Sequence, residues 1–214
     1  MNYKQVDVSQ WARFKQYQFF KKYDNPFFNI CSALDVNELY RLCQDKSISF
    51  STALLFAAID TANKVKEFRY RIYEGGVIEF DSIYAGSTLL NKDETFNFCY
   101  FDYDENFEKF HCNAQKQIEK NKKGIVNFDG RNDDLDIIHF STIPWISFTC
   151  FSNPRNYKTD DSIPKIVFGK YYEKEGRKHL PISVEVHHAL MDGLHLGQYL
   201  EKLQNLLNYP DFIR

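Results

Sequence analysis

The chain has 214 residues, and hydrophobic residues make up 43% of them, which is enough to form a core and excludes a disordered protein. The formal net charge is −2, and acidic and basic residues are interspersed without a basic stripe, so we expect no nucleic-acid partner. No apolar run is long enough to span a membrane, and the first residues lack the apolar segment of a secretory signal. The five cysteines follow no disulfide or metal-binding spacing, so we interpret them as reduced thiols of a cytoplasmic protein.

The first half of the chain mixes helical and strand patterns. In chain order it predicts a helix, a strand, two helices and three strands, over residues 10–23, 27–34, 35–46, 51–65, 69–73, 77–80 and 95–103. Ser9 is a plausible N-cap for the first helix, and Asp35 with Glu38 has the spacing of a capping box for the second. The third helix is apolar on most faces and is therefore expected to be buried.

The second half predicts a helix, two strands, a hairpin and a final helix, over residues 106–122, 136–141, 146–151, 165–172 with 179–186, and 194–208. Basic residues in the last turn of the helix over 106–122, followed by Gly124, mark its C-terminus. Strands with interleaved helices and several hairpins predict an α/β fold. We expect a single two-layer domain over residues 1–214, in which helices cover a mixed β-sheet.

The segment PISVEVHHALMDGLH, residues 181–195, holds the clearest chemical signal. A strand ends at His187 and His188, and a short turn leads to Asp192 and Gly193, where the last helix begins. A histidine at the end of a strand, oriented by a turn and followed by a carboxylate, suits general-base catalysis.

The pattern His-His-x-x-x-Asp-Gly resembles the active-site motif of the CoA-dependent acyltransferases. The segments DVSQWAR, EFRYRI, EFDSI, STIPW and VEVHHALMDGLHLGQYLEKLQ, together with MNY at the start, lie where the chloramphenicol acetyltransferase family has similar segments. The chain length also matches, so the resemblance covers nearly the whole chain. It implies the chloramphenicol acetyltransferase-like form of the α/β fold.

The resemblance assigns a role to each of several residues. It makes His188 the base that takes the proton of an acceptor hydroxyl and leaves His187 a structural role. Asp192 is then expected to form a structural ion pair with Arg13 of the N-terminal helix, although its position also suits a helix N-cap. Ser141 in STIPW matches the serine whose hydroxyl stabilises the oxyanion of the tetrahedral intermediate.

The resemblance also places ligands. Lys170 and Tyr171 match positions near CoA, where a lysine can meet a phosphate and an aromatic ring can flank the adenine, although a solvated lysine and an ordinary sheet tyrosine fit equally well. The expected acceptor pocket includes Phe19, Phe20 and Phe98.

Several positions depart from the family pattern. Phe20 stands where tyrosine is common, Phe98 where a small residue lines the antibiotic cavity, and Asp24 and Asn25 replace apolar residues. Two further departures are His139 in place of an asparagine and Val167 in place of a threonine. Most of these changes lie on the acceptor side, so acyl transfer is better supported than chloramphenicol as the acceptor.

The resemblance thus implies acetyl transfer from acetyl-CoA, as a co-substrate, to a hydroxyl of a small acceptor, as in antibiotic resistance by chloramphenicol O-acetylation, with no permanently bound cofactor and no metal. It further implies a homotrimer with active sites between subunits, and the 20 Phe and 14 Tyr are consistent with a large interface.

Three alternatives compete with this hypothesis. His188, Asp192 and His195 would share one face if residues 188–195 were helical, which would allow a metal site. A homologue that binds a ligand without catalysis would keep the fold but would not need the whole set of site residues. An acyltransferase of the same fold with a different acceptor, including a lipoyl-linked one, is the third.

Overall fold

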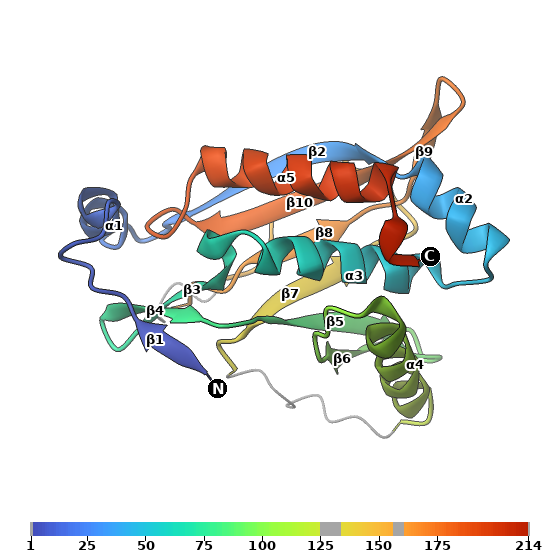
Figure 1. The fold of residues 1–214 in the computed structure, drawn as a ribbon, viewed down its shortest axis with the longest axis horizontal. Coiled ribbons are helices and arrows are strands. Elements are labelled where there is room, and N and C mark those ends of the chain that lie inside the picture. The colour runs from blue at the N-terminus through green and yellow to red at the C-terminus, as the bar shows by residue number, and fades with distance from the viewer. Residues whose placement is uncertain (1, 125–133, 156–160, 214) are drawn as a thin grey trace.

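The computed structural model describes residues 2–124, 134–155 and 161–213. Its strands form two sheets (Figure 1). The larger, seven-stranded sheet has the order β2-β10-β8-β7-β5-β6, with β9 paired to β10 at the side. Its strands are β2 (Phe27–Asp35), β5 (Tyr84–Leu90), β6 (Phe96–Phe101), β7 (Ile137–Thr142), β8 (Lys165–Phe168), β9 (Tyr172–Lys174) and β10 (Arg177–His187). β7 runs parallel to β5 and β8, and the other pairs are antiparallel, so the sheet is mixed.

The smaller sheet is antiparallel and has the order β1-β4-β3, with bounds Tyr3–Gln5, Gly76–Phe80 and Tyr70–Tyr73. The helices are α1 (Phe14–Phe20), α2 (Asn37–Asp45), α3 (Phe50–Asn63), α4 (Phe107–Lys122) and α5 (Gly193–Asn208), with short 3-10 helices at Lys66–Arg69 and Asp211–Ile213. In Figure 1, α3 and α5 lie across one face of the larger sheet. Among the residues described, no helix has the length and apolar character needed to cross a membrane.

The two faces of the larger sheet have different surroundings. Because side chains alternate along a strand, Val184 and Val186 of β10 point into the core beneath the helices, and both are fully buried. Ser183, Glu185 and His187 point to the opposite face. There the segment after β7 covers them, since Asn29 of β2 donates both to the carbonyl of Phe151 (2.7 Å) and to Ser183 Oγ (2.8 Å). The face of the larger sheet that bears Ser183, Glu185 and His187 is therefore polar and covered by the chain, and it is not simply exposed to solvent.

The structure confirms the predicted α/β class and the mixed sheet covered by helices. The helix predicted over 106–122 is α4, with Asn106 as its N-cap, and the final helix is α5, with Asp192 as its N-cap. Ser49 caps α3 by accepting from the backbone N–H of Thr52.

Two predicted helix starts are wrong. The N-terminal helix begins at Phe14 instead of residue 10, because Ser9 Oγ donates to Asp7 (2.6 Å) and its hydroxyl is thus engaged before the helix. The capping box at α2 does not form, since the N-cap is Val36, although Asp35 Oδ1 accepts from the backbone N–H of Asn37 (2.9 Å) while its Oδ2 accepts from Arg177.

Two strands were missed and one was wrongly predicted. β1 and β5 were not predicted, and residues 146–151 form an irregular segment in place of the expected strand. The hairpin around Glu175 and Gly176 joins β9 to β10, while β8 is a separate neighbour of β10. The missed strand β5 matters for the site, because it lies beside Ser141.

Candidate active site

The turn between β10 and α5 holds most of the candidate residues. Asp192 Oδ1 accepts from the backbone N–H of Leu194 (3.1 Å), which caps α5. A cap of this kind contributes about 1 kcal/mol to stability. His195 Nδ1 accepts from the N–H of Asp192 (3.1 Å), and its Nε2 faces Glu67 at 3.5 Å. The start of α5 is therefore fixed from both sides.

Three backbone or ring contacts fix His188. Its N–H donates to the carbonyl of Pro26 (2.8 Å), and its own carbonyl accepts from Arg13 Nη2 (3.0 Å). Its ring Nδ1 lies 3.2 Å from the carbonyl oxygen of Met191. A carbonyl only accepts, so Nδ1 carries the proton of the neutral imidazole and Nε2 is the basic nitrogen. Nε2 makes no hydrogen bond within the described part of the chain, which leaves it available for a substrate.

Two aromatic rings hold the plane of the His188 imidazole. Phe20 of α1 stacks on it with ring centroids 3.9 Å apart and planes at 10°, and Phe28 of β2 packs against it at 4.6 Å. Phe20 therefore contacts the proposed base itself. Phe19, the next residue, is 57% exposed and packs against Phe20 and Tyr23.

Arg13 and Asp192 form the ion pair that the sequence predicted. Arg13 Nη1 lies 2.5 Å from Asp192 Oδ2, and Arg13 immediately precedes α1. Burial by itself raises the pKa of Asp192, but the hydrogen bond from Arg13 and the positive charges nearby lower that pKa overall. The same guanidinium binds the carbonyl of His188, so the pair ties α1 to the catalytic turn.

His187 is buried and has a different environment. Its Nδ1 accepts from the backbone N–H of Ala189 (3.2 Å), and its ring packs edge-on against Phe27. Burial lowers the pKa of His187 to about 4, so the ring is neutral at pH 7. These contacts make His187 a support for the turn.

Ser141 lies in a second cluster, at the end of β7. Its Oγ is 3.3 Å from Thr88 Oγ1 on β5. Phe98 of β6 is the register partner of Thr88, so the three side chains share the face of the sheet opposite the helices. Thr88 therefore lies between Ser141 and Phe98 on this face of the sheet, one strand from each.

Within one chain, the Ser141 cluster and the His188 turn are far apart. In register, Ser141 pairs with Val167 and Val167 pairs with Ser183. Ser183 precedes His188 by five residues, which spans roughly 16 Å of strand, and β7 lies two strands or roughly 10 Å from β10. One small reacting group cannot contact both residues of the same chain.

The predicted CoA residues follow β8. Lys170 is exposed, and its backbone N–H donates to the carbonyl of Ile146 (2.8 Å). The ring of Tyr171 packs edge-on against Tyr40, and Lys178 Nζ lies 5.1 Å from its centroid. The cationic groups of Lys170 and Lys178 thus accompany the aromatic rings of Tyr40 and Tyr171 in this part of the structure.

The metal alternative requires one helical face that carries His188, Asp192 and His195. In the structure α5 begins at Gly193, and His188 lies in the turn before it. Over residues 2–124, 134–155 and 161–213, no group of three or more histidine, cysteine or carboxylate side chains is arranged to hold a metal ion.

Sequence reasoning missed Thr88, Phe28 and the carbonyl of Met191. Thr88 lies on the unpredicted strand β5, and a backbone carbonyl has no signature in the sequence. Phe28 is an apolar residue of a predicted strand that pairs in register with the end of β10, and this pairing is the signal that could have identified it.

Comparisons with known proteins agree with this geometry. The sequence profile of the chloramphenicol acetyltransferase family matches residues 1–204. Chloramphenicol acetyltransferase 3 of Escherichia coli is 29% identical over 97% of this chain and 98% of its own length. A chloramphenicol acetyltransferase of Clostridium perfringens is 28% identical over 100% and 99%.

Solved structures give the same result. A chloramphenicol acetyltransferase superposes with a TM-score of 0.88 at 26% identity, covering 96% of this chain and all of the other. The dihydrolipoamide acetyltransferase of Azotobacter vinelandii shares the fold, with a TM-score of 0.70 at 17% identity over 93% of this chain and 88% of the other. The fold is therefore that of the CoA-dependent acyltransferases. Within that class, the chain belongs to the chloramphenicol acetyltransferase family, whose members are acyltransferase enzymes.

The low pKa of His187 predicts an acid-dependent loss of stability. The unfolded chain protonates this histidine near pH 6.5, whereas the folded chain resists protonation down to about pH 4. Stability therefore falls as the pH drops through this interval, by up to about 3 kcal/mol for one such group. In His187→Asn, the amide oxygen can still accept from Ala189, and urea unfolding between pH 4 and 7 should show a flatter dependence.

His139, whose pKa burial also lowers to about 4, keeps its own contribution in this variant, so part of the slope remains. Identical pH dependence of unfolding in His187→Asn and the wild type would contradict the assignment.

Proposed function

We propose that the chain transfers the acetyl group of acetyl-CoA to a hydroxyl group of a small, chloramphenicol-like acceptor, in the cytoplasm where acetyl-CoA is available, with residues 1–214 as one catalytic domain. The observation that carries the proposal is the His188 imidazole, whose backbone, ring plane and Nδ1 are all held while no described residue bonds to Nε2. The family match over residues 1–204 supports the reaction class.

The proposed chemistry follows from His188 Nε2, the ring nitrogen to which no described residue bonds. His188 Nε2 takes the proton of the acceptor hydroxyl as its oxygen attacks the thioester carbonyl carbon. The tetrahedral intermediate then collapses, the carbon–sulfur bond breaks, and the CoA thiolate takes the proton from the imidazolium. The Met191 carbonyl keeps the Nδ1 proton in place throughout, so the ring exchanges only the proton at Nε2.

Ser141 is the proposed oxyanion donor. During attack, negative charge develops on the thioester oxygen, and a fixed hydroxyl donor there is worth roughly 2.7–4 kcal/mol. Thr88 can donate to Ser141 Oγ, which directs the Ser141 proton toward the substrate.

We further propose that the active site forms between two chains of a homotrimer, with His188 from one chain and Ser141 from its neighbour. The separation of the two residues within one chain supports this arrangement, since both must contact the same intermediate. The exposed aromatic side chains Phe19 and Phe96 are consistent with surfaces that a neighbour covers. Arg13 and Asp192 hold the shape of the site without contacting the substrate.

The acceptor pocket is the proposed source of specificity. In this proposal Phe98, which lies beside Thr88 on the same face as Ser141, narrows the pocket, and Phe19 and Phe20 border it on the His188 side of the site. Filling a pocket with a larger side chain weakens binding by about 1–3 kcal/mol per misfit group. We therefore propose that chloramphenicol is a poor acceptor and that another hydroxyl compound is preferred.

For CoA, we propose that Lys170 binds a phosphate and that Tyr171 flanks the adenine, with Lys178 beside its ring. No permanently bound cofactor and no metal ion are needed for this mechanism.

Removal of the base tests the mechanism directly. His188→Ala should lower kcat by about 10²–10⁴-fold, because proton removal by a positioned base contributes on that scale. The KM for acetyl-CoA and the free energy of unfolding should stay near the wild-type values. Thiol release from acetyl-CoA, measured with chloramphenicol and a panel of alcohols, gives the rates. His187→Asn is the matched control, and near-normal turnover of His188→Ala would refute the mechanism.

The shared site predicts complementation between inactive chains. Co-expression of His188→Ala and Ser141→Ala chains in equal amounts should give mixed trimers in which roughly a quarter of the sites contain both wild-type residues. Activity should therefore exceed that of either variant alone and approach a quarter of the wild-type rate.

The matched control pairs His188→Ala with a chain that carries both substitutions, which cannot rebuild a site. If the first mixture gains no more activity than this control, the two residues act within one chain or not at all.

A further inference from the structure

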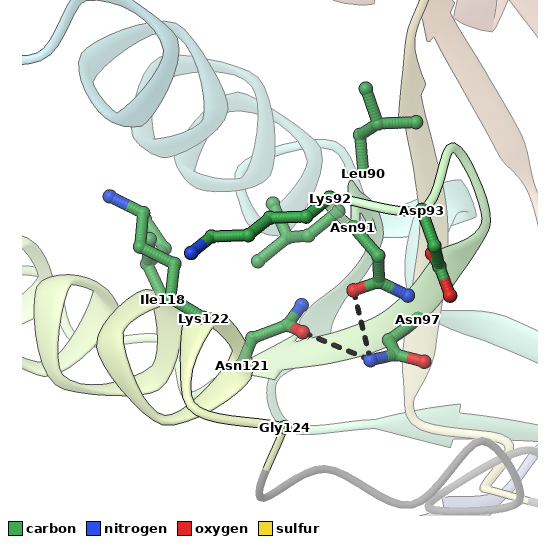
Figure 2. Close-up of a pocket in the computed structure, with 10 residues that line it drawn as sticks. Leu90, Asn91, Lys92, Asp93, Asn97, Ile118, Asn121, Lys122 and Gly124 are labelled. Carbon is green, nitrogen blue, oxygen red and sulfur yellow. Dashed lines mark hydrogen bonds between the residues drawn. The ribbon is translucent and has the colours of Figure 1, made fainter.

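A large hollow lies between the end of β5, the turn into β6 and the last two turns of α4 (Figure 2). Its volume is about 820 Å³, which is within the range of small-molecule sites. Neither His188 nor Ser141 lines it, and neither do the proposed CoA residues Lys170 and Tyr171.

A buried amide donor points into this hollow. Asn121 is only 4% exposed, and its Nδ2 has no hydrogen-bond partner within the described part of the chain. Its Oδ1 accepts from Asn97 Nδ2 (3.1 Å), which also donates to Asn91 Oδ1 (3.2 Å). Figure 2 shows that this chain of amides leaves the Asn121 nitrogen directed toward Lys92. A buried donor without a partner is unfavourable, so a ligand acceptor atom at this position would be stabilised.

The charges around the donor are positive. In Figure 2, Lys92 extends from the β5–β6 turn toward α4, on which Lys122 lies. Neither ammonium group forms an ion pair across the ranges described. Asp93, the carboxylate among the described lining residues, already accepts from Thr95 N and Oγ1. Two unpaired cations outweigh the partial negative charge at the end of α4 and favour an anion.

The floor of the hollow is apolar. Leu89, which lies opposite Asn97 on the side of β5 that faces α4, and Ile118 of α4 supply this apolar surface. An inorganic anion alone would leave this surface in contact with water. An apolar group attached to the anion would cover it.

From the buried donor, the two neighbouring lysines and the apolar surface, we propose that this hollow binds an amphiphilic oxyanion. Such a ligand is a carboxylate or a phosphate monoester attached to an aliphatic or aromatic body. The oxyanion lies between Lys92 and Lys122 and accepts from Asn121 Nδ2, and the apolar body covers Leu89 and Ile118. The site is separate from acetyl transfer and does not depend on the proposed catalytic mechanism.

The test uses the full chain labelled with ¹⁵N and four probes: octyl phosphate, octanoate, octanol and inorganic phosphate. We expect the two amphiphilic anions to shift the amide signals of Leu89 and Asn121 and to bind at least about tenfold more tightly than octanol or inorganic phosphate. Tighter binding of octyl phosphate would identify the head group as a phosphate, and tighter binding of octanoate would identify it as a carboxylate. Equal affinity for octanol would show a purely apolar surface and would overturn the proposal, as would the absence of shifts at these residues.

Variants separate the site from general surface charge. Lys92→Glu with Lys122→Glu should weaken binding of the preferred anion at least about tenfold, and Asn121→Leu should weaken it through loss of the donor. Lys120→Glu with Lys123→Glu is the matched control, because these lysines line a different surface depression of α4 and should leave affinity within about threefold.

Two further readouts distinguish this site from the catalytic one. Saturation with CoA should leave octyl phosphate binding in place, and complete displacement by CoA would assign the hollow to the CoA site and overturn the proposal. Thiol release by the Lys92→Glu, Lys122→Glu variant should remain at the wild-type level whether or not the anion binds. The binding assay therefore tests the anion site, and the thiol-release assay tests acetyl transfer, so each proposal can fail without the other.

Discussion

The hydrogen bond between His188 Nδ1 and the carbonyl oxygen of Met191 determines which nitrogen of the imidazole can act as a base. A neutral imidazole has one N–H, and a carbonyl can only accept, so this bond places the proton on Nδ1 and the lone pair on Nε2. The turn between β10 and α5 places the carbonyl of Met191 beside the ring. Asp192 fixes the conformation of this turn by capping α5 and by pairing with Arg13, which in turn binds the carbonyl of His188. The ion pair thus affects the base without touching a substrate.

The second constraint is the spacing of the sheet. In register across β7, β8 and β10, Ser141 lies level with Ser183, five residues before His188. The proposed base and oxyanion donor of one chain are therefore separated by two strand spacings across the sheet and by about half the length of β10 along it. A site that needs both groups within contact of one carbonyl carbon must take them from two chains. In the proposed mechanism catalysis therefore requires assembly, because a second chain must bring its His188 to the face of the sheet that bears Ser141 and Thr88.

Much of this could be predicted from the sequence where local signals and tertiary structure agree. The helices predicted over 106–122 and 194–208 are α4 and α5, and Asp192, whose position suited a helix N-cap, caps α5. The strand that carries Ser141 was predicted from the local pattern over residues 136–141, and the pairing of Arg13 with Asp192 was expected from the resemblance to the family. The prediction failed where a side chain had a competing partner. Ser9 bonds to Asp7 and does not cap the first helix, whereas Asp35 accepts from Asn37 at the start of α2 but stands one residue before the N-cap, Val36.

Three features of the structure could not be predicted because the local sequence gives either no signal for them or a misleading one. β5 carries small residues from Ala85 to Thr88 in place of an alternating apolar pattern, and only pairing with both β6 and β7 makes it a strand. Residues 146–151 have the apolar alternation of a strand, but the segment instead covers the polar face of the sheet, where the carbonyl of Phe151 accepts from Asn29. The direction of the Met191 carbonyl follows from the complete turn and from no residue type.

The tautomer of His188 is the most direct test of the central claim. In a chain with ¹⁵N-labelled histidine, NMR spectra near neutral pH report which ring nitrogen bears the proton. The hydrogen bond to Met191 predicts that His188 is present as the Nδ1–H tautomer, with Nε2 unprotonated. A His188 ring protonated on Nε2 alone would contradict the account, because its basic nitrogen would then face the protein backbone and not the acceptor hydroxyl.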